Sequence, residues 1–472
     1  MSIVDRMIHL STVGAVIPCP LMTLLAGDHE PPVVVGEGEI TVMSATIFGY
    51  QIRGTPADVG HALRSLHRID SDPYDGTLRE RLVVTTADGL KLSGGWTSPT
   101  VRTPDEGGVW TFTGEVESLT YHEDGEFEPG TEVAFLLPQH HRARMLLRRF
   151  MDLTGSGNRR AKALKVNGAD LLITLEDDNG VLIMSAPASD VFRPTFAENW
   201  LGEPLRVLFG QLIFPRYVLR QSNNWSMGWV RPSPEWSSVS DRCALWQGPD
   251  ELVDKQEFWD SYRRLLSYVA ASRNAAGHPN FEANRMTELY VEVIQAARGS
   301  RWVWALTYAS AAEGFIDLLG LEGSQQIDMG EAQFAELATA VEAFKKYVGD
   351  WHGDPRLIEP TSNAADRMLT TTAAIALRQL KRQGHVTAEQ YRAWSKLRNK
   401  VMHGKLVSPY SSAEDDKLLL DLSGLLHALT RRLISYVDPD ASRVVKPDPA
   451  TVETGVVSAD ESVEPPPSEP AT

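Results

Sequence analysis

The sequence has only two cysteines, Cys19 and Cys243, among 472 residues. Two cysteines cannot build a disulfide framework or a cysteine-rich metal site of the zinc-finger kind. The sequence also lacks any run of 18 apolar residues, so it predicts no transmembrane helix. Residues 7–27 come nearest to a signal peptide, but one histidine and two prolines interrupt their apolar run. We therefore expect a cytoplasmic protein that does not associate with membranes.

Positive charge is scarce as well. The chain has 46 Lys and Arg against 62 Asp and Glu, which gives a net charge of −16. This balance argues against indiscriminate binding to nucleic acid. Part of the acidity lies in residues 438–472, where proline and acidic residues are frequent and apolar residues are too few to bury a core. We expect this segment to be a disordered acidic tail.

The first 220 residues are typical of a β-rich domain. Short runs of β-branched and aromatic residues alternate with turn sequences such as "EDG" and "DDNG". The clearest hairpin is "ITLEDDNGVLIM", with Asn179 and Gly180 at its turn. The pattern predicts an antiparallel sandwich or barrel-like domain. The expected strands lie within 40–54, 80–94, 109–121, 132–138, 170–186 and 205–214.

A tryptophan-rich segment, 221–250, follows the predicted strands. Its four tryptophans lie among serines, prolines and glycines. Tryptophans in this setting usually pack a connecting segment onto a domain, although they can also stack on a ligand. We interpret 221–250 as a connection between the β-rich domain and the next part of the chain.

Residues 251–437 change to a helical period and predict an all-α domain. Thr387 and Gln390 have the spacing of a capping box, and Gly384 and Gly404 suit helix C-termini. The length of the chain is consistent with two or three domains, so we predict an α+β multidomain protein. The expected helices are 255–272, 284–297, 301–320, 331–350, 364–384, 387–403 and 413–437.

The stretch "LRNKVMHGKL" ends one of these helices and raises a chemical question. On a helical wheel, Arg398 falls within about 40° of Trp394, in the middle of an apolar stripe. An arginine in such a place is costly unless an anion meets it. One candidate is Glu313, in the predicted helix "YASAAEGFIDLLG". The other is a substrate phosphate, to which a guanidinium can donate two hydrogen bonds.

Two further stretches have an arginine four to six residues before a histidine. One pairs Arg273 with His278, and the other pairs Arg378 with His385. His278 lies between a glycine and a proline, and His385 follows Gly384, so each histidine lies beyond a helix end. Only the stretch from Arg398 to His403 is carried up to its histidine by one amphipathic helix.

Arg398, the polar Asn399 and His403 resemble the Arg-x4–6-His signature of HEPN domains. In these helical modules, a glutamate often occupies the first core helix, which "SAAEGFIDLLG" resembles. The resemblance covers about residues 285–437. The β-rich part, with "LGEPLRVLFGQLIFPRYVLRQ" near its end, resembles the N-terminal half of ApeA-like prokaryotic proteins, which are linked to anti-phage defence.

The resemblance implies a metal-independent ribonuclease that needs no cofactor and acts in abortive infection. The 2′-hydroxyl of RNA would be the nucleophile, His403 would transfer a proton and Arg398 would neutralise the phosphate. Asn399 and Glu313 would complete the site by orienting these groups. It also implies a homodimer or even oligomer, with the N-terminal domain sensing a phage component. Two alternatives stay open: an inactive HEPN-type binding module, and an ion pair between Arg398 and Glu313 that is purely structural.

A basic stretch at 140–165 is a candidate RNA-binding surface in this acidic chain. A solvated helix face followed by a basic loop explains the same pattern. The sequence "GSGN" at 155–158 lacks the residues of a nucleotide-binding loop, and the adjacent histidines at 140–141 do not have metal-ligand spacing. The candidate RNA contacts are Arg142, Arg144, Arg148, Arg149, Arg159 and Arg160.

Overall fold

The computed structural model describes most of the chain between residues 7 and 440. The described residues are 7, 10, 12–26, 30–44, 46–71, 79–102, 108–138, 141–154, 158–178, 180–190, 192–232, 243–246, 255–273, 276, 284–321, 331–402 and 412–440. His403, His278 and nearly all of the predicted acidic tail therefore lie outside the described residues.

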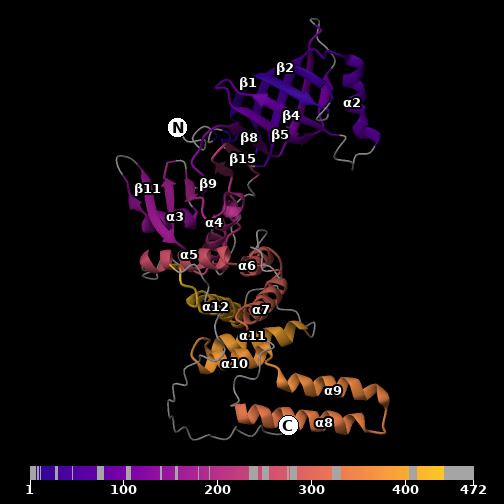
Figure 1. The fold of residues 1–472 in the computed structure, drawn as a ribbon, viewed down its shortest axis with the longest axis vertical. Helices are drawn as coiled ribbons and strands as arrows, with labels where there is room; N and C mark the ends of the chain where they lie inside the picture. Colours follow the sequence, from indigo (N-terminus) through magenta and orange to yellow (C-terminus); the bar gives the residue numbers. More distant parts are fainter. Residues whose placement is uncertain are drawn as a thin grey trace. The chain divides into compact units, whose positions relative to one another are not determined.

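The chain divides into two compact units. The first unit comprises Met1–Leu318 and Leu377–Val445, and the second comprises Leu319–Ala376 with Lys446–Thr472. These units do not follow the predicted boundaries at residues 220 and 250. The first unit holds both an antiparallel sheet and several of the helices that follow it (Figure 1).

The predicted antiparallel β-rich part is present in the first unit. Its strands pair in the order β10-β11-β12-β13-β9-β14-β15-β8-β5-β4-β1-β2-β3-β7-β6, and every pairing between neighbours is antiparallel. The strands before α3 are β1 (Val16–Leu25), β2 (Pro32–Val42), β3 (Phe48–Gly54), β4 (Glu80–Thr85), β5 (Lys91–Thr97), β6 (Thr100–Arg102), β7 (Trp110–Val116), β8 (Leu119–Asp124) and β9 (Gly130–Leu136). Those after it are β10 (Asp152–Leu153), β11 (Arg159–Val166), β12 (Ala169–Glu176), β13 (Val181–Pro187), β14 (Tyr217–Ser222) and β15 (Trp225–Val230).

The segment that most resembled a signal peptide forms a strand inside this sheet. Strand β1 pairs with β2 on one side and with β4 on the other. Alternate side chains of β1, including Ile17, Cys19 and Met22, are buried in a core that also takes residues from β2 and β3. The prolines that interrupt the apolar run of the sequence are thus accommodated in a strand.

Helices interrupt the β-rich part, and one of them corrects a predicted strand. The stretch 205–214 is not a strand, because α4 (Pro194–Phe209) covers its first half. Pro194 lies at the start of α4, where its missing N–H costs nothing, and Gly210 ends the helix with a φ of 60°. The two other helices of this part are α2 (Val59–Ser71), which lies beside β2 in Figure 1, and α3 (Arg142–Phe150).

The tryptophan-rich segment is another correction. Residues 225–230 do not connect two domains but form β15, which pairs with β14 and with β8 inside the sheet. Three tryptophans of the segment are described. Trp225 is half-buried in β15 and Trp246 is buried. The guanidinium carbons of Arg220 and Arg231 lie 4.7 and 5.9 Å from the ring centre of Trp229. All three pack within the protein, as the packing interpretation predicts.

The helical part follows closely the helices expected from the sequence. It comprises α5 (Lys255–Ala270), α6 (Arg285–Ala296), α7 (Arg301–Leu318), α8 (Glu331–Gly349), α9 (Ile358–Asp366), α10 (Ala373–Arg382), α11 (Ala388–Met402) and α12 (Ala413–Ser435). The single helix predicted over 364–384 is wrong, because α9 and α10 are separated by a short 3-10 turn and by Thr370–Thr372. Thr372 accepts a hydrogen bond from the backbone of Ile375, and it begins the new helix instead of continuing the old one.

Helices α8 and α9 belong to the second unit and pack against each other. Lys345 of α8 forms an ion pair of 2.9 Å with Asp366 of α9. Few of the described side chains of this unit are buried, among them Val341, Val348 and Ala365. The second unit therefore contributes little to the protein's apolar core.

Helix α5 joins the sheet to the helical bundle of the first unit. Its Trp259 donates a hydrogen bond to the carbonyl of Phe150, and its Tyr262 donates one to the carbonyl of Leu201, each at 3.0 Å. The same helix packs against α12. Near the end of the described chain, Asp440 forms a 2.6 Å ion pair with Arg263 of α5, so the first residues assigned to the disordered tail are held on the first unit.

Candidate functional site

The candidate site is built on α7 and α11, which pack against each other and against α12. Glu313 of α7 and Arg398 of α11 form an ion pair, with 2.5 Å between Oε1 and Nε. The predicted proximity of these two side chains is therefore confirmed. About 41% of the Arg398 side chain and 33% of the Glu313 side chain remain exposed, so the pair lies at the surface of the bundle and not in its core.

Local sequence explains why α11 presents Arg398 in this way. The capping box is present, because Thr387 accepts a hydrogen bond from the backbone of Gln390 and Gln390 accepts one in return. Trp394 and Leu397 of the predicted apolar stripe are buried. Arg398 lies at the border of that stripe, with its Cζ atom 5.5 Å from the centre of the Trp394 ring. The guanidinium therefore lies over the indole ring, and part of the Arg398 side chain remains exposed.

The motif has two other predicted residues, Asn399 and His403, and the structure describes only the first of them. Asn399 is exposed on α11. By its place in the helix it shares the outer face with Lys396, which forms an ion pair with Glu414. His403 lies one residue beyond the described end of the helix. The structure thus brings Arg398 and Glu313 together, leaves Asn399 exposed beside them and does not describe His403.

Of the two rival arginine–histidine stretches, one can be placed in part. Gly384 adopts a φ of 77°, and His385 follows it, exposed, in the turn between α10 and α11. Partial burial and the positive charge of Arg432 lower the pKa of His385 below its usual value of 6.5. Arg378 is exposed on α10. The turn separates His385 from the helix of Arg378, as predicted, whereas His278 is outside the described residues.

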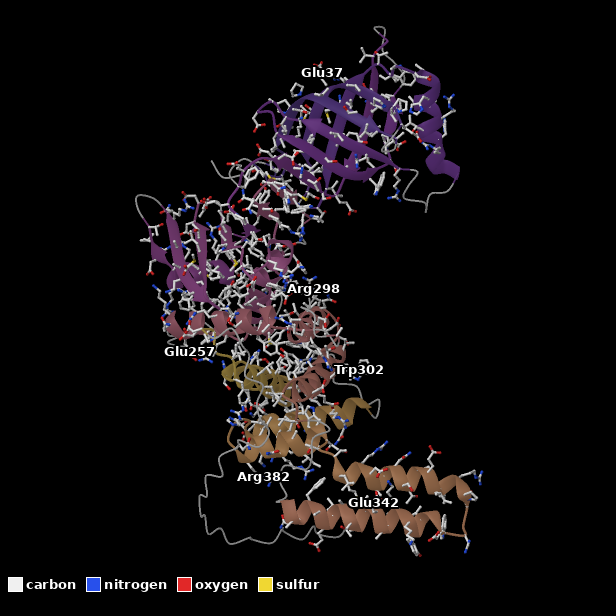
Figure 2. The ribbon with its side chains drawn as sticks, viewed as in Figure 1. Glu37, Glu257, Arg298, Trp302, Glu342 and Arg382 are labelled. Carbon is white, nitrogen blue, oxygen red and sulfur yellow. The ribbon has the colours of Figure 1, made fainter. Side chains whose placement is uncertain are left out.

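A second basic segment, which the sequence analysis missed, contains Arg398. Residues 377–405 contain eight basic residues and a single acid, Glu389. The net charge of the whole chain does not reveal this local excess of basic residues, because the chain as a whole is strongly acidic. Arg382, labelled in Figure 2, lies at the end of α10. The exposed basic side chains that the structure describes in this segment, besides the half-buried Arg398, are Arg378, Lys381, Arg382, Arg392 and Lys396.

The basic stretch at 140–165 has a largely structural role. Arg144, Arg148 and Arg160 converge on the buried carboxylate of Asp177, with separations of 3.8, 2.9 and 3.5 Å. Arg142 donates a hydrogen bond to the carbonyl of Trp246. Of the predicted RNA contacts, Arg144 is therefore buried and Arg142, Arg148 and Arg160 are engaged within the protein. Arg149 and Arg159 are exposed.

Searches for a metal site and for a membrane span were negative within the described part of the chain. No group of three or more His, Cys, Asp or Glu side chains among the described residues is placed to hold a metal ion. Likewise, no described helix is long and apolar enough to cross a membrane. Arg398 therefore offers a half-buried cation that is held by a carboxylate and lies in a basic segment of the chain.

Comparison with protein-family models, with curated proteins and with solved structures finds no match to this chain.

Proposed function

We propose that the chain is an endoribonuclease of the HEPN type, whose active site contains Arg398 and His403. The observation that carries this proposal is the setting of Arg398. Its guanidinium is accessible, oriented by Glu313 and Trp394, and lies in a segment with seven more basic than acidic residues. A polyanion would be attracted to such a surface even though the protein as a whole is acidic.

The proposed reaction uses the RNA's own 2′-hydroxyl as the nucleophile. His403 transfers a proton, because an imidazole titrates near neutral pH. Arg398 stabilises the negative charge that builds on the phosphate oxygens in the transition state. Glu313 positions the guanidinium, and Asn399 donates a hydrogen bond from its side-chain amide to the same phosphate. This attack leaves a product that ends in a 2′,3′-cyclic phosphate.

Cleavage by this route needs a base and an acid on opposite sides of the phosphate. One chain supplies a single histidine in this motif, and the second group would come most simply from the same motif of another chain. We therefore propose a homodimer or higher even oligomer, and a reaction that proceeds without metal or cofactor. The β-rich part would sense a phage component and regulate the nuclease in a cytoplasmic defence response.

A second candidate function is favoured by one specific contact. The 2.5 Å ion pair occupies Arg398 with a carboxylate, which is what a structural arginine would do. In that case the helical part would be a non-catalytic module that binds a partner or a second chain. The two functions differ in what the loss of His403 does, because a binding module does not depend on a proton donor.

The decisive experiment measures RNA cleavage by the full chain in the presence of EDTA. We expect His403→Ala to abolish cleavage, with His385→Ala as the matched control that leaves it unchanged. A His278→Ala variant serves as a second control. Equal loss from either control would show that the wrong stretch had been chosen, and full wild-type activity that depended on a metal would contradict the proposed chemistry.

Assembly is tested separately by mixing chains. If two motifs form one site, a His403→Ala chain co-expressed with a wild-type chain lowers activity more than dilution predicts. Mass measurement in solution gives the oligomeric state of each mixture. A fully active monomer would rule out the shared site while leaving the assignment of Arg398 and His403 intact.

A further inference from the structure

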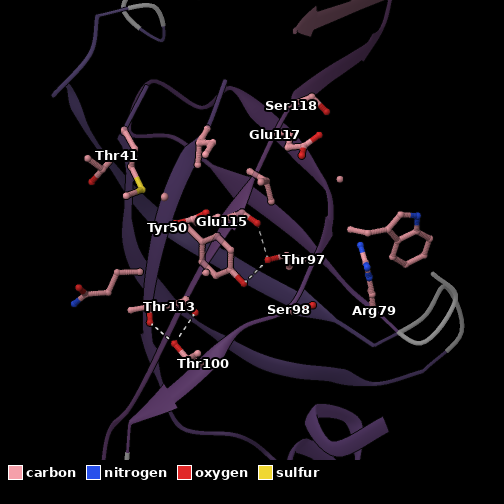
Figure 3. Close-up of a pocket in the computed structure, with 18 of the residues that line it drawn as sticks. Thr41, Tyr50, Arg79, Thr97, Ser98, Thr100, Thr113, Glu115, Glu117 and Ser118 are labelled. Carbon is pink, nitrogen blue, oxygen red and sulfur yellow. Dashed lines mark hydrogen bonds between the residues drawn. The ribbon is translucent and has the colours of Figure 1, made fainter. Parts of the chain in front are cut away.

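A cavity of about 950 Å³ lies in the sheet, where β5 ends and β7 turns into β8 (Figure 3). Its volume lies in the range of small-molecule sites. Strand β5 pairs with β8 only through Leu92–Gly94, and β6 pairs with β7 only through Thr111–Thr113. Beyond those residues, no backbone hydrogen-bond ladder joins the ends of β5 and β7 in the described part of the chain. The cavity opens where this ladder is absent.

Side-chain hydroxyl groups bridge the gap in place of a backbone ladder. The Thr97 hydroxyl donates a 2.9 Å hydrogen bond to the carbonyl of Glu115, and it lies 3.0 Å from the hydroxyl of Tyr50 (Figure 3). Tyr50 can lie across β7 only because residue 114 is glycine. A Cβ atom on Gly114 would lie 2.4 Å from the Tyr50 hydroxyl. The floor of the cavity is therefore a fixed arrangement that depends on specific residues.

The cavity combines hydrogen-bond donors and acceptors with one exposed aromatic face. Thr100 and Thr113 pair their hydroxyl groups at 2.8 Å on one side (Figure 3). Glu115 and Glu117 contribute carboxylates to the lining. Trp96 also lines the cavity, and it leaves 51% of its surface exposed, which is unfavourable for so large an apolar side chain.

The charges in the lining select among ligand classes. Among the described lining residues, three carboxylates, including Glu115 and Glu117, outnumber the single arginine, Arg79, so an anion would be repelled. A cation is disfavoured at the aromatic face, because the β4–β5 register pairs Arg81 with Trp96 and Arg79 also lines the cavity. A neutral ligand with many hydroxyl groups satisfies both the donors and the acceptors, and its C–H face can pack on Trp96.

We propose that this cavity is a carbohydrate-binding site. The site is independent of the nuclease proposed above, since it lies in the sheet and requires no RNA. A saccharide would stack on Trp96 and exchange hydrogen bonds with Glu115, Glu117 and the hydroxyl pair of Thr100 and Thr113.

The test is isothermal titration of the full chain with glucose, maltotriose, cellotriose and the N-acetylglucosamine trimer. We expect at least one of these saccharides to bind, and Trp96→Ala to weaken its binding by about tenfold or more. Trp351→Ala is the matched control, because Trp351 is also exposed but belongs to the second unit. Thr113→Val, which removes one hydroxyl without changing the shape, should weaken binding as well.

Two results would overturn the proposal. The first is that none of the four saccharides gives heat of binding at about 10 mM, a concentration that detects even weak sites. The second is that a saccharide binds to the Trp96→Ala variant as tightly as it binds to the Trp351→Ala variant. Parallel titrations with spermidine, a cation, and with ATP, an anion, show whether the ligand class was misassigned. If either one binds and Trp96→Ala weakens that binding, the site takes a cation or an anion and not a saccharide.

Discussion

Replacing Arg398 should separate the stability of the bundle from its activity. The ion pair with Glu313 has exposed fractions of 41% and 33%, so its strength falls in the range of surface pairs, about 0.2 to 1 kcal/mol. The contact of the guanidinium with the Trp394 ring adds about 0.5 to 1 kcal/mol. We therefore expect Arg398→Ala to lower the free energy of unfolding by about 1 to 2 kcal/mol. A deeply buried pair, which the sequence left open, would cost about 3 kcal/mol or more.

Cleavage should respond much more strongly than stability. If Arg398 stabilises charge on the phosphate in the transition state, Arg398→Ala lowers the cleavage rate by about 100-fold or more. Glu313→Ala should have a smaller effect on the rate, because the guanidinium remains but is held less firmly. Urea unfolding followed by far-UV circular dichroism gives the first quantity, and cleavage of a labelled RNA gives the second.

The chain offers a matched control for this experiment. Arg301 of α7 forms a 2.5 Å ion pair with Asp416 of α12, of similar geometry and with somewhat lower exposure. Arg301→Ala should therefore cost at least as much stability as Arg398→Ala while leaving cleavage unchanged. The reasoning is refuted if Arg398→Ala costs about 3 kcal/mol or more, if it leaves cleavage intact, or if both arginines reduce cleavage equally.

Two further predictions concern buried carboxylates outside the candidate site. Asp177→Ala leaves the buried Arg144 without its carboxylate partner. We expect this variant to lower the free energy of unfolding, measured by urea titration, by about 3 to 5 kcal/mol. A loss below about 1 kcal/mol would contradict the expectation. Burial raises the pKa of Glu203 from 4.5 to about 7. Between these pH values the folded protein keeps a proton on Glu203 that the unfolded chain releases. The stabilisation that comes from the bound proton is therefore lost as the pH rises from 4.5 to about 7. Glu203→Gln should remove that dependence while keeping an acceptor for the Thr287 hydroxyl. Wild type should therefore lose stability relative to the variant between about pH 4.5 and pH 7, and parallel curves of unfolding free energy against pH would refute the assignment.

Helices were the most predictable part of the fold, because their signals are local. Helix α11 was expected at 387–403 and is described over Ala388–Met402, since a capping box and an apolar stripe together define it. Helix α4 was mistaken in part for a strand because its residues 205–209 are apolar and include a β-branched valine. Its start at Pro194 and its end at Gly210 are the local signals that could have identified it.

The candidate site was predictable where it depended on one helix, and less so where it depended on distant residues. Arg398 was identified from its position on an apolar stripe, and that same position required an anion, either an acid such as Glu313 or a substrate phosphate. The partner of Arg144 could not be anticipated, because Asp177 follows β12 and its position depends on the pairing of β11 with β12. The basic surface of α10 and α11 could have been found by computing charge in short windows instead of over the whole chain.

The position of α12 has a consequence for protein synthesis. This helix is the last described element, yet eleven of its side chains are buried, and it packs against α5, α7 and α11. Tyr290 of α6 also depends on it, through a 2.8 Å hydrogen bond with Thr430. A nascent chain therefore cannot complete the bundle until residues near 435 have emerged from the ribosome, although the sheet can form earlier. If the site around Arg398 cleaves RNA, that activity cannot appear before α12 has been synthesised.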